Sequence, residues 1–220
     1  MNKKLACFLL ILLFLPLALL SAHTINYQME GKPLGYVFGY YFKMGFQHIL
    51  PKGLDHILFV VSLYLLSPRL KDVVWQATAF TVAHTITLIL TMKNVIVAPP
   101  AVIEPIIALS ICFVALENLL VSELKIWRIA VVFLFGLVHG MGFASALNEM
   151  GVPRDSFFYS LITFNVGVEA GQLTVILACY FAFGRWFANR PWYRPRIVYP
   201  MSICIALIAA VWTVQRILNV

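Results

Sequence analysis

Six long apolar segments follow residue 53, and short polar loops separate them. The approximate spans of these segments are 54–67, 73–92, 97–121, 126–148, 156–183 and 197–218. A transmembrane helix needs about 20 predominantly apolar residues, a length that every segment except the first approaches or exceeds. Hydrocarbon offers no partner for backbone N–H and C=O groups, so such a segment must fold as a helix that pairs them internally. The sequence therefore predicts an all-α fold, a polytopic transmembrane helix bundle with about six spans.

The composition of the chain is that of a protein embedded in lipid. Of its 220 residues, 62% are hydrophobic and only 11% are charged, whereas soluble domains carry about 25% charged residues. The formal net charge of +7 is carried by short segments between the apolar runs, which is typical of topology signals rather than of a nucleic-acid surface. We therefore expect the lipid bilayer as a partner and exclude nucleic acid.

Residues 1–22 have the pattern of a cleavable signal peptide. Two lysines precede an apolar run, and two small residues, ending in Ala22, follow it. The alternative is an uncleaved first transmembrane helix. Cleavage after Ala22 would leave His23 at the N-terminus, where the amine and the imidazole together can chelate a metal. An ordinary exposed histidine is the alternative at that position.

The rest of the chain, 23–220, is expected to form a single transmembrane domain. Its first part, 23–53, is predicted to be a short periplasmic or interfacial segment, with a short or interfacial helix in the aromatic-rich stretch 34–50. The proline and the glycine of 51–53 then break the chain, and the spanning helices are expected to begin at residue 54.

Lysine and arginine are distributed unevenly among the loops. The first, third and fifth loops hold most of them: Arg69, Lys71, Lys125, Arg128, Arg185, Arg190, Arg194 and Arg196. The second and fourth loops hold only Lys93 and Arg154. Because basic residues are enriched in cytoplasmic loops, the odd-numbered loops are predicted to be cytoplasmic and the mature N-terminus periplasmic, in a bacterial-type inner membrane.

Several ionisable side chains lie within or next to the apolar segments. Placing a charge at the bilayer centre costs about 2.5–3.5 kcal/mol on insertion scales, so each of these residues is a functional candidate. On the predicted topology most of them fall in the periplasmic half of the bundle or near its centre: His48, Asp55, His56, His84, Glu104, His139 and Glu169, with Asn165 one helical turn before Glu169. Glu117 lies towards the cytoplasmic end instead. The shared depth predicts one site in the bundle interior, with these histidines and carboxylates as candidate metal ligands.

Imidazole and carboxylate groups together favour a divalent metal such as nickel, cobalt or zinc. No thiol joins the set, which disfavours a soft Cu(I) site. The alternative is that these polar side chains only form hydrogen bonds between helices. In that case His48 could be an interfacial residue, and Glu104 could mark a helix kink together with Pro105.

The surroundings of two histidines favour burial against other helices. Gly136 and Gly140 flank His139 and form a face of small residues that lets a neighbouring helix approach closely. Thr81 lies one helical turn before His84 and could serve as its hydrogen-bond partner.

Five sequence strings occur in order after the predicted signal peptide. They are HILPKGLDHILF (48–59), FTVAHTITL (80–88), Glu104 with ALS (108–110), GLVHGMGFA (136–144) and FNVGVEAGQ (164–172). This set resembles the HupE/UreJ family of small membrane proteins, which are linked to hydrogenase and urease systems and regarded as nickel or cobalt permeases. The resemblance implies proteins of metalloenzyme maturation as partners. Assembly into a homo-oligomer is the alternative.

The resemblance also implies a set of metal-binding residues. His48, Asp55 and His56 match the His-Asp-His element of the family, and His139 matches its later histidine motif.

The chain departs from the nickel transporters of the family in two places. Six residues lie between His48 and Asp55, where those transporters have five. A second histidine and a following glutamate of the later motif are replaced here by Phe135 and Gly142. The sequence therefore resembles the second, less characterised branch of the family, for which metal binding is better implied than nickel selectivity.

These observations predict a divalent-metal permease of the nickel/cobalt type, with its site in the periplasmic half of the bundle. The alternative is an intramembrane zinc-dependent hydrolase that acts at the outer leaflet. In that protein the histidines would hold zinc and Asp55 or Glu169 would act as general base. A third interpretation is a metal-stabilised assembly partner without turnover.

Overall fold

The computed structural model describes residue 26 and residues 28–218. Every regular element within these residues is helical, so the predicted all-α fold is confirmed. The elements are α2 (Leu34–Ile49), α3 (Leu54–Leu66), α4 (Leu70–Met92), α5 (Pro100–Leu120), α6 (Ile126–Met150), α7 (Phe157–Cys179), η1 (Tyr180–Gly184), α8 (Arg185–Phe187), η2 (Arg194–Val198) and α9 (Tyr199–Leu218). The predicted signal peptide and His23 lie outside the described residues.

Among the described helices, five are long and apolar enough to cross a membrane: Leu70–Met92, Pro100–Leu120, Ile126–Met150, Phe157–Phe187 and Arg194–Leu218. The pair α2 and α3 makes a sixth span if the two helices, bent by 68° at their junction, are counted as one broken span. This agrees with about six predicted spans. The last two are longer than predicted because η1 and α8 continue α7 to Phe187, and η2 precedes α9 from Arg194.

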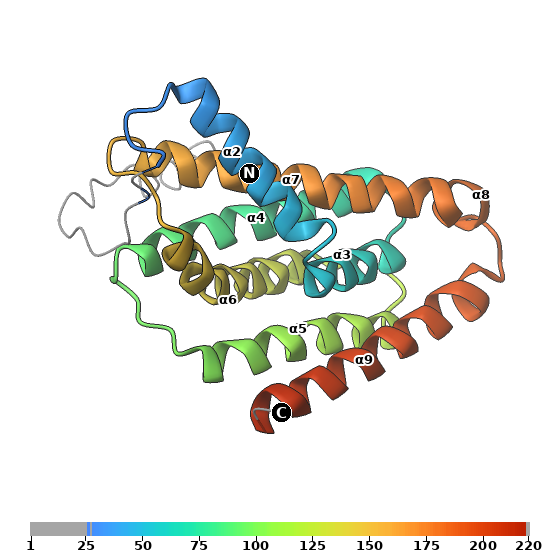
Figure 1. Ribbon diagram of the computed structural model, residues 1–220. Helices are drawn as coiled ribbons and strands as arrows, with labels where there is room; N and C mark the ends of the chain where they lie inside the picture. Colours follow the sequence, from blue (N-terminus) through green and yellow to red (C-terminus); the bar gives the residue numbers. More distant parts are fainter. Residues whose placement is uncertain (1–25, 27, 219–220) are drawn as a thin grey trace.

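The chain is already helical from Leu34, twenty residues before the first predicted span. The buried residues of α2 recur every fourth position: Val37, Tyr41, Gly45 and Ile49. This spacing places them on one helix face. Helix α2 crosses α7 (Figure 1), and Gly45 and Ile49 of this face contact α7. The 13-residue α3 is too short to cross the hydrocarbon core by itself.

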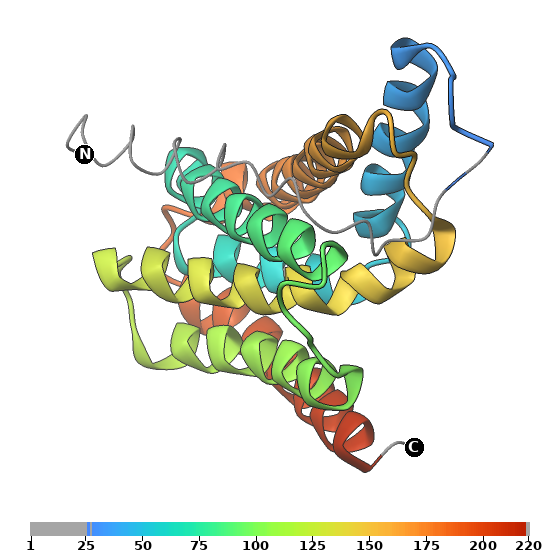
Figure 2. The ribbon, with the colours of Figure 1, turned by 90° about the vertical axis from the view of Figure 1, so that its left-hand side faces the viewer.

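Three helix pairs make the most extensive contacts: α4 with α6, α2 with α7, and α5 with α9. In Figure 2, α2 and α7 lie on one side of the bundle and α5 and α9 on the other, with α4 and α6 between them. The short α3 contacts α4, α5, α7 and α9, and most of its residues are buried. It therefore forms the centre of the bundle.

Small residues set the close spacing of α4 and α6. A Cβ atom on Gly140 would overlap the backbone carbonyl of His84 and the hydroxyl of Thr87, and Gly136 is equally close to the α4 backbone. The Thr87 hydroxyl donates a hydrogen bond across the interface to the carbonyl of Leu137, at 2.7 Å. The predicted face of small residues on α6 is thus confirmed, and it brings the α4 and α6 backbones around His84 and His139 together.

Candidate metal centre

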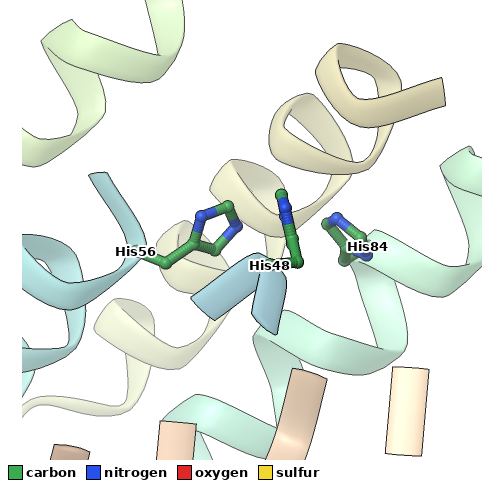
Figure 3. A group of neighbouring side chains, drawn as sticks. All are labelled: His48, His56 and His84. Carbon is green, nitrogen blue, oxygen red and sulfur yellow. The ribbon is translucent and has the colours of Figure 1, made fainter. Parts of the chain in front are cut away.

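Four helices bring four histidines to one place in the bundle. His48 lies in the last turn of α2, His56 in the first turn of α3, His84 in α4 and His139 in α6. One ring nitrogen each of His48, His56 and His84 lie within 4.8 Å of one another, which is a spacing that could hold a metal ion. Figure 3 shows His48 between the other two rings. The His139 ring centroid is 5.2 Å from that of His56.

The break between α2 and α3 is what brings His48 and His56 together. In a continuous helix, residues eight positions apart are separated by about 12 Å along the axis. Here the chain bends by 68° between the two helices, and the two ring centroids are 4.6 Å apart. Gly53 lies at the bend, where a Cβ atom would overlap the backbone carbonyl of His48. The tight bend therefore requires a residue without a side chain.

The histidine rings are removed from solvent and leave ring nitrogens without partners. His84 and His139 are 0% and 1% exposed, and His56 is 6% exposed. Among the described residues, buried ring nitrogens without a hydrogen-bond partner occur on all four rings: His48 Nε2, both His56 nitrogens, His84 Nε2 and His139 Nδ1. Leaving a buried polar atom unpaired costs about 1–3 kcal/mol. A divalent metal would satisfy several of these atoms at once, so the donor set fits such an ion.

Aromatic rings line the space around the histidines. Phe143 lies 3.9 Å from His48 between ring centroids, and Phe59 and Phe80 lie 5.5 Å and 4.9 Å from His139. These rings exclude water and lower the local dielectric, which strengthens any electrostatic interaction within the site.

Two of the predicted carboxylates lie at a cavity next to the histidines. The cavity has a volume of about 290 Å³, and its lining includes His48, His56 and His139 together with Asp55 and Glu104. Glu104 is exposed, and α5 continues unbroken past the proline that follows it. These carboxylates line the approach to the histidines and are not part of the three-histidine group.

Asn165 and Glu169 are one turn apart in α7, but the structure places them differently. Asn165 Oδ1 lies 2.9 Å from His84 Nδ1. The Glu169 carboxylate instead accepts hydrogen bonds from Thr78 and Thr81, at a separate, largely apolar groove between α4 and α7. Glu169 is therefore not brought together with the four histidines. Thr81, which we expected beside His84, contacts Glu169, and Asn165 is the partner of His84.

Sequence reasoning missed two residues at this site. Ser110 of α5 contacts His139 Nε2 at 3.0 Å, and Arg216 of α9 lines the cavity. The signal for Ser110 was its hydroxyl within an apolar helix, in the ALS string next to Glu104. For Arg216 the signal was a charge within the last apolar segment.

A second polar cluster lies at the opposite end of the bundle. Arg128 was counted as a loop charge, but it lies in the first turn of α6, is 1% exposed, and forms an ion pair with Glu117 at 2.8 Å. Its guanidinium also donates to Gln76 and Asn118. This network joins α4, α5 and α6 beyond the histidines.

Searches of the curated proteins and of the solved structures each found no match. A sequence profile described as HupE / UreJ protein matches residues 22–216. That range contains all four clustered histidines, the cavity-lining carboxylates and, apart from the last two residues of Arg194–Leu218, every candidate membrane span of the described residues. The chain is a member of the HupE/UreJ family.

Proposed function

We propose that this membrane protein binds a divalent transition-metal ion at His48, His56, His84 and His139 and carries it across the bilayer as a nickel/cobalt-type permease. One observation carries the proposal: three buried imidazoles and the half-buried imidazole of His48 come from four helices and converge beside a cavity. Each of the four has a ring nitrogen without another partner in the described part of the chain. Nitrogen donors of this kind suit nickel, cobalt and zinc.

The carboxylates beside the histidines support entry of an ion from the cavity. Neutral imidazoles leave the 2+ charge of the ion uncompensated, and a buried uncompensated charge is costly. The carboxylates Asp55 and Glu104 line the cavity and are not part of the three-histidine group. A passing ion would meet these carboxylates first and then exchange them for the histidines. On the orientation predicted from the basic residues of the loops, we infer that this cavity faces the periplasm of a bacterial inner membrane.

The experiment combines metal content with flux. Protein purified in detergent is incubated with nickel, cobalt or zinc and assayed by elemental mass spectrometry, for the wild type, His84→Ala and His139→Ala. The same proteins in liposomes are tested for metal uptake with a trapped metal-sensitive dye. Thr174→Val is the matched control, because the Thr174 hydroxyl is exposed and donates only within its own helix.

We expect exchangeable binding and uptake for the wild type and the control, and loss of both in the histidine variants. Failure of the wild type to bind any of the three ions would refute the proposal.

The second candidate is the zinc-dependent hydrolase. It is favoured by one observation, the presence of Asp55 and Glu104 at a cavity beside three imidazoles, since a catalytic zinc site needs three protein ligands and a nearby base for its water. About one tightly held zinc per chain without uptake would support this candidate over the permease.

A further inference from the structure

We infer that Asn165 and Ser110 are positioning residues that fix which ring nitrogen of His84 and of His139 faces the metal. The inference rests on the proposed metal site. A neutral imidazole carries one proton on its two nitrogens, and only the nitrogen without the proton can bind a metal. The partner of the other nitrogen therefore decides which atom is available as a ligand.

The contacts of Asn165 define the state of His84. The Asn165 side-chain NH₂ donates to the backbone carbonyl of Leu161 at 2.8 Å, so its amide oxygen is the atom that faces His84 Nδ1 at 2.9 Å. An amide oxygen only accepts hydrogen bonds. His84 Nδ1 must then carry the proton, and Nε2 is left with its lone pair. Nε2 is also the His84 nitrogen that is buried without a partner.

The contacts of Ser110 place the proton of His139 on Nε2, the opposite ring nitrogen to that of His84. The Ser110 hydroxyl donates its single proton to the carbonyl of Ile107 at 2.7 Å, and its oxygen lies 3.0 Å from His139 Nε2. The shorter bond assigns the proton to the carbonyl contact, so the oxygen accepts from Nε2–H. This leaves the lone pair on His139 Nδ1, which is again the buried nitrogen without a partner.

His84 thus carries its proton on Nδ1 and His139 on Nε2. The other nitrogen of each ring keeps its lone pair and is buried without a hydrogen-bond partner. These two nitrogens are therefore the atoms of His84 and His139 available to a metal. All of these side chains are buried: Ser110 is 1% exposed and Asn165 4%. Solvent therefore does not compete for the two contacts, and the site is ordered for an incoming ion before the ion arrives.

The first test reads the protonation directly in metal-free protein. The chain has five histidines, so ¹⁵N-histidine labelling gives a spectrum that single His→Gln variants can assign. We expect His84 in the Nδ1–H form and His139 in the Nε2–H form. Asn165→Leu should convert His84 to a mixture of both forms and leave His139 unchanged, and Ser110→Ala should do the reverse.

The second test measures cobalt affinity by competition with a chelating dye. We expect Asn165→Leu to weaken binding by about 10–100-fold, the usual effect of removing such a partner. Asn165→Asp should restore affinity, because its carboxylate still accepts from Nδ1–H although it cannot donate to the Leu161 carbonyl. Ser110→Thr should likewise restore the affinity that Ser110→Ala loses.

The two tests separate the inference from the proposed function. Wild-type protein that binds no cobalt would refute the metal site, whatever its histidine spectrum. Cobalt binding with His84 in the Nε2–H form, or equal affinities for Asn165→Leu and the wild type, would refute the positioning role alone. Equal losses in Asn165→Asp and Asn165→Leu would also refute it, because they would show that packing through the amide donor is what matters.

Discussion

Arg216 in the last helix donates a hydrogen bond to Asp55 at the start of α3, with Nη2 and Oδ2 2.8 Å apart. The same guanidinium donates through Nη1 to the backbone carbonyl of Glu104 in α5. All three residues line the cavity beside the histidines. One cation therefore joins three helices at the cavity and engages the carboxylate that precedes His56 in the sequence.

Replacing Arg216 should make the site easier for a metal to reach. Arg216→Met removes a positive charge from the cavity and frees Asp55, so we expect cobalt to associate faster, by about tenfold at low ionic strength. Both side chains are about one-quarter exposed, and the loss of such a pair should lower the free energy of unfolding by only about 0.2–1 kcal/mol. Stopped-flow absorbance measures the association rate. Arg216→Lys, which keeps the charge, should remain slow, and a slow Arg216→Met would contradict the idea.

Metal binding should stabilise the folded protein. At a free metal concentration of 100 times Kd, a ligand that binds only the native state adds about 2.7 kcal/mol to the free energy of unfolding. Thermal unfolding in detergent should therefore shift to higher temperature with nickel or cobalt and return on adding a chelator. His84→Ala should show no shift, whereas Thr174→Val should respond as the wild type does. A shift of equal size in His84→Ala would mean that the ion binds elsewhere.

A methyl group at Gly140 should separate α4 from α6. Gly140→Ala places its Cβ against the His84 carbonyl and the Thr87 hydroxyl, and such overpacking costs about 1–3 kcal/mol. Because the overlap is with the backbone of His84 itself, metal affinity should fall together with thermal stability. Gly39→Ala is the matched control in α2, since a Cβ there meets nothing within 4 Å. An unchanged Gly140→Ala protein would show that the two helices are not packed as described.

Replacing one partner of the Glu117–Arg128 pair should destabilise the fold more than replacing both with uncharged residues. Arg128→Met leaves a 7% exposed carboxylate without its cation, and breaking a buried pair from one side costs about 3–5 kcal/mol. Combining it with Glu117→Gln should recover much of that loss, because no buried charge is left. Arg69→Met, which removes an exposed partner of Asp72, should cost at most about 1 kcal/mol. Denaturant unfolding measures the wild type and the three variants, and a double variant as unstable as Arg128→Met would contradict this account.

The sequence was sufficient to predict the helices and much of the histidine cluster. Long apolar segments leave the backbone no alternative to helix in lipid, and the shared depth of His56, His84 and His139 along their spans follows from residue counting. The close approach of a neighbouring helix to α6 followed from the spacing of Gly136 and Gly140, and the structure identifies that neighbour as α4. Each of these properties can be read from the sequence of a single segment or by comparing residue positions in several segments.

Other features depend on how a helix is rotated about its axis or on the angle between two helices. Counting residues along the sequence gives neither of these. The direction of the Glu169 side chain depends on how α7 is turned about its axis, and it faces Thr78 rather than the histidines. The position of His48 depends on the angle between α2 and α3. Arg128 follows the polar loop 121–125, so its charge suggested a topology signal. Only the packing of α5 against α6 shows that Arg128 is buried and forms an ion pair with Glu117.

The broken pair of α2 and α3 also bears on how the protein is made. Unpaired backbone at membrane depth is tolerated only where protein covers it or where it lines a cavity, and α2 finds its cover on α7, with Gly45 and Gly167 at the contact. Helix α7 begins at Phe157, more than a hundred residues after α2 ends. During biosynthesis we therefore expect α2 to reach its packed position only after α7 has been synthesised. We therefore expect His48 to be the last of the four histidines to reach its place, and a nascent chain that stops before α7 to have an incomplete site.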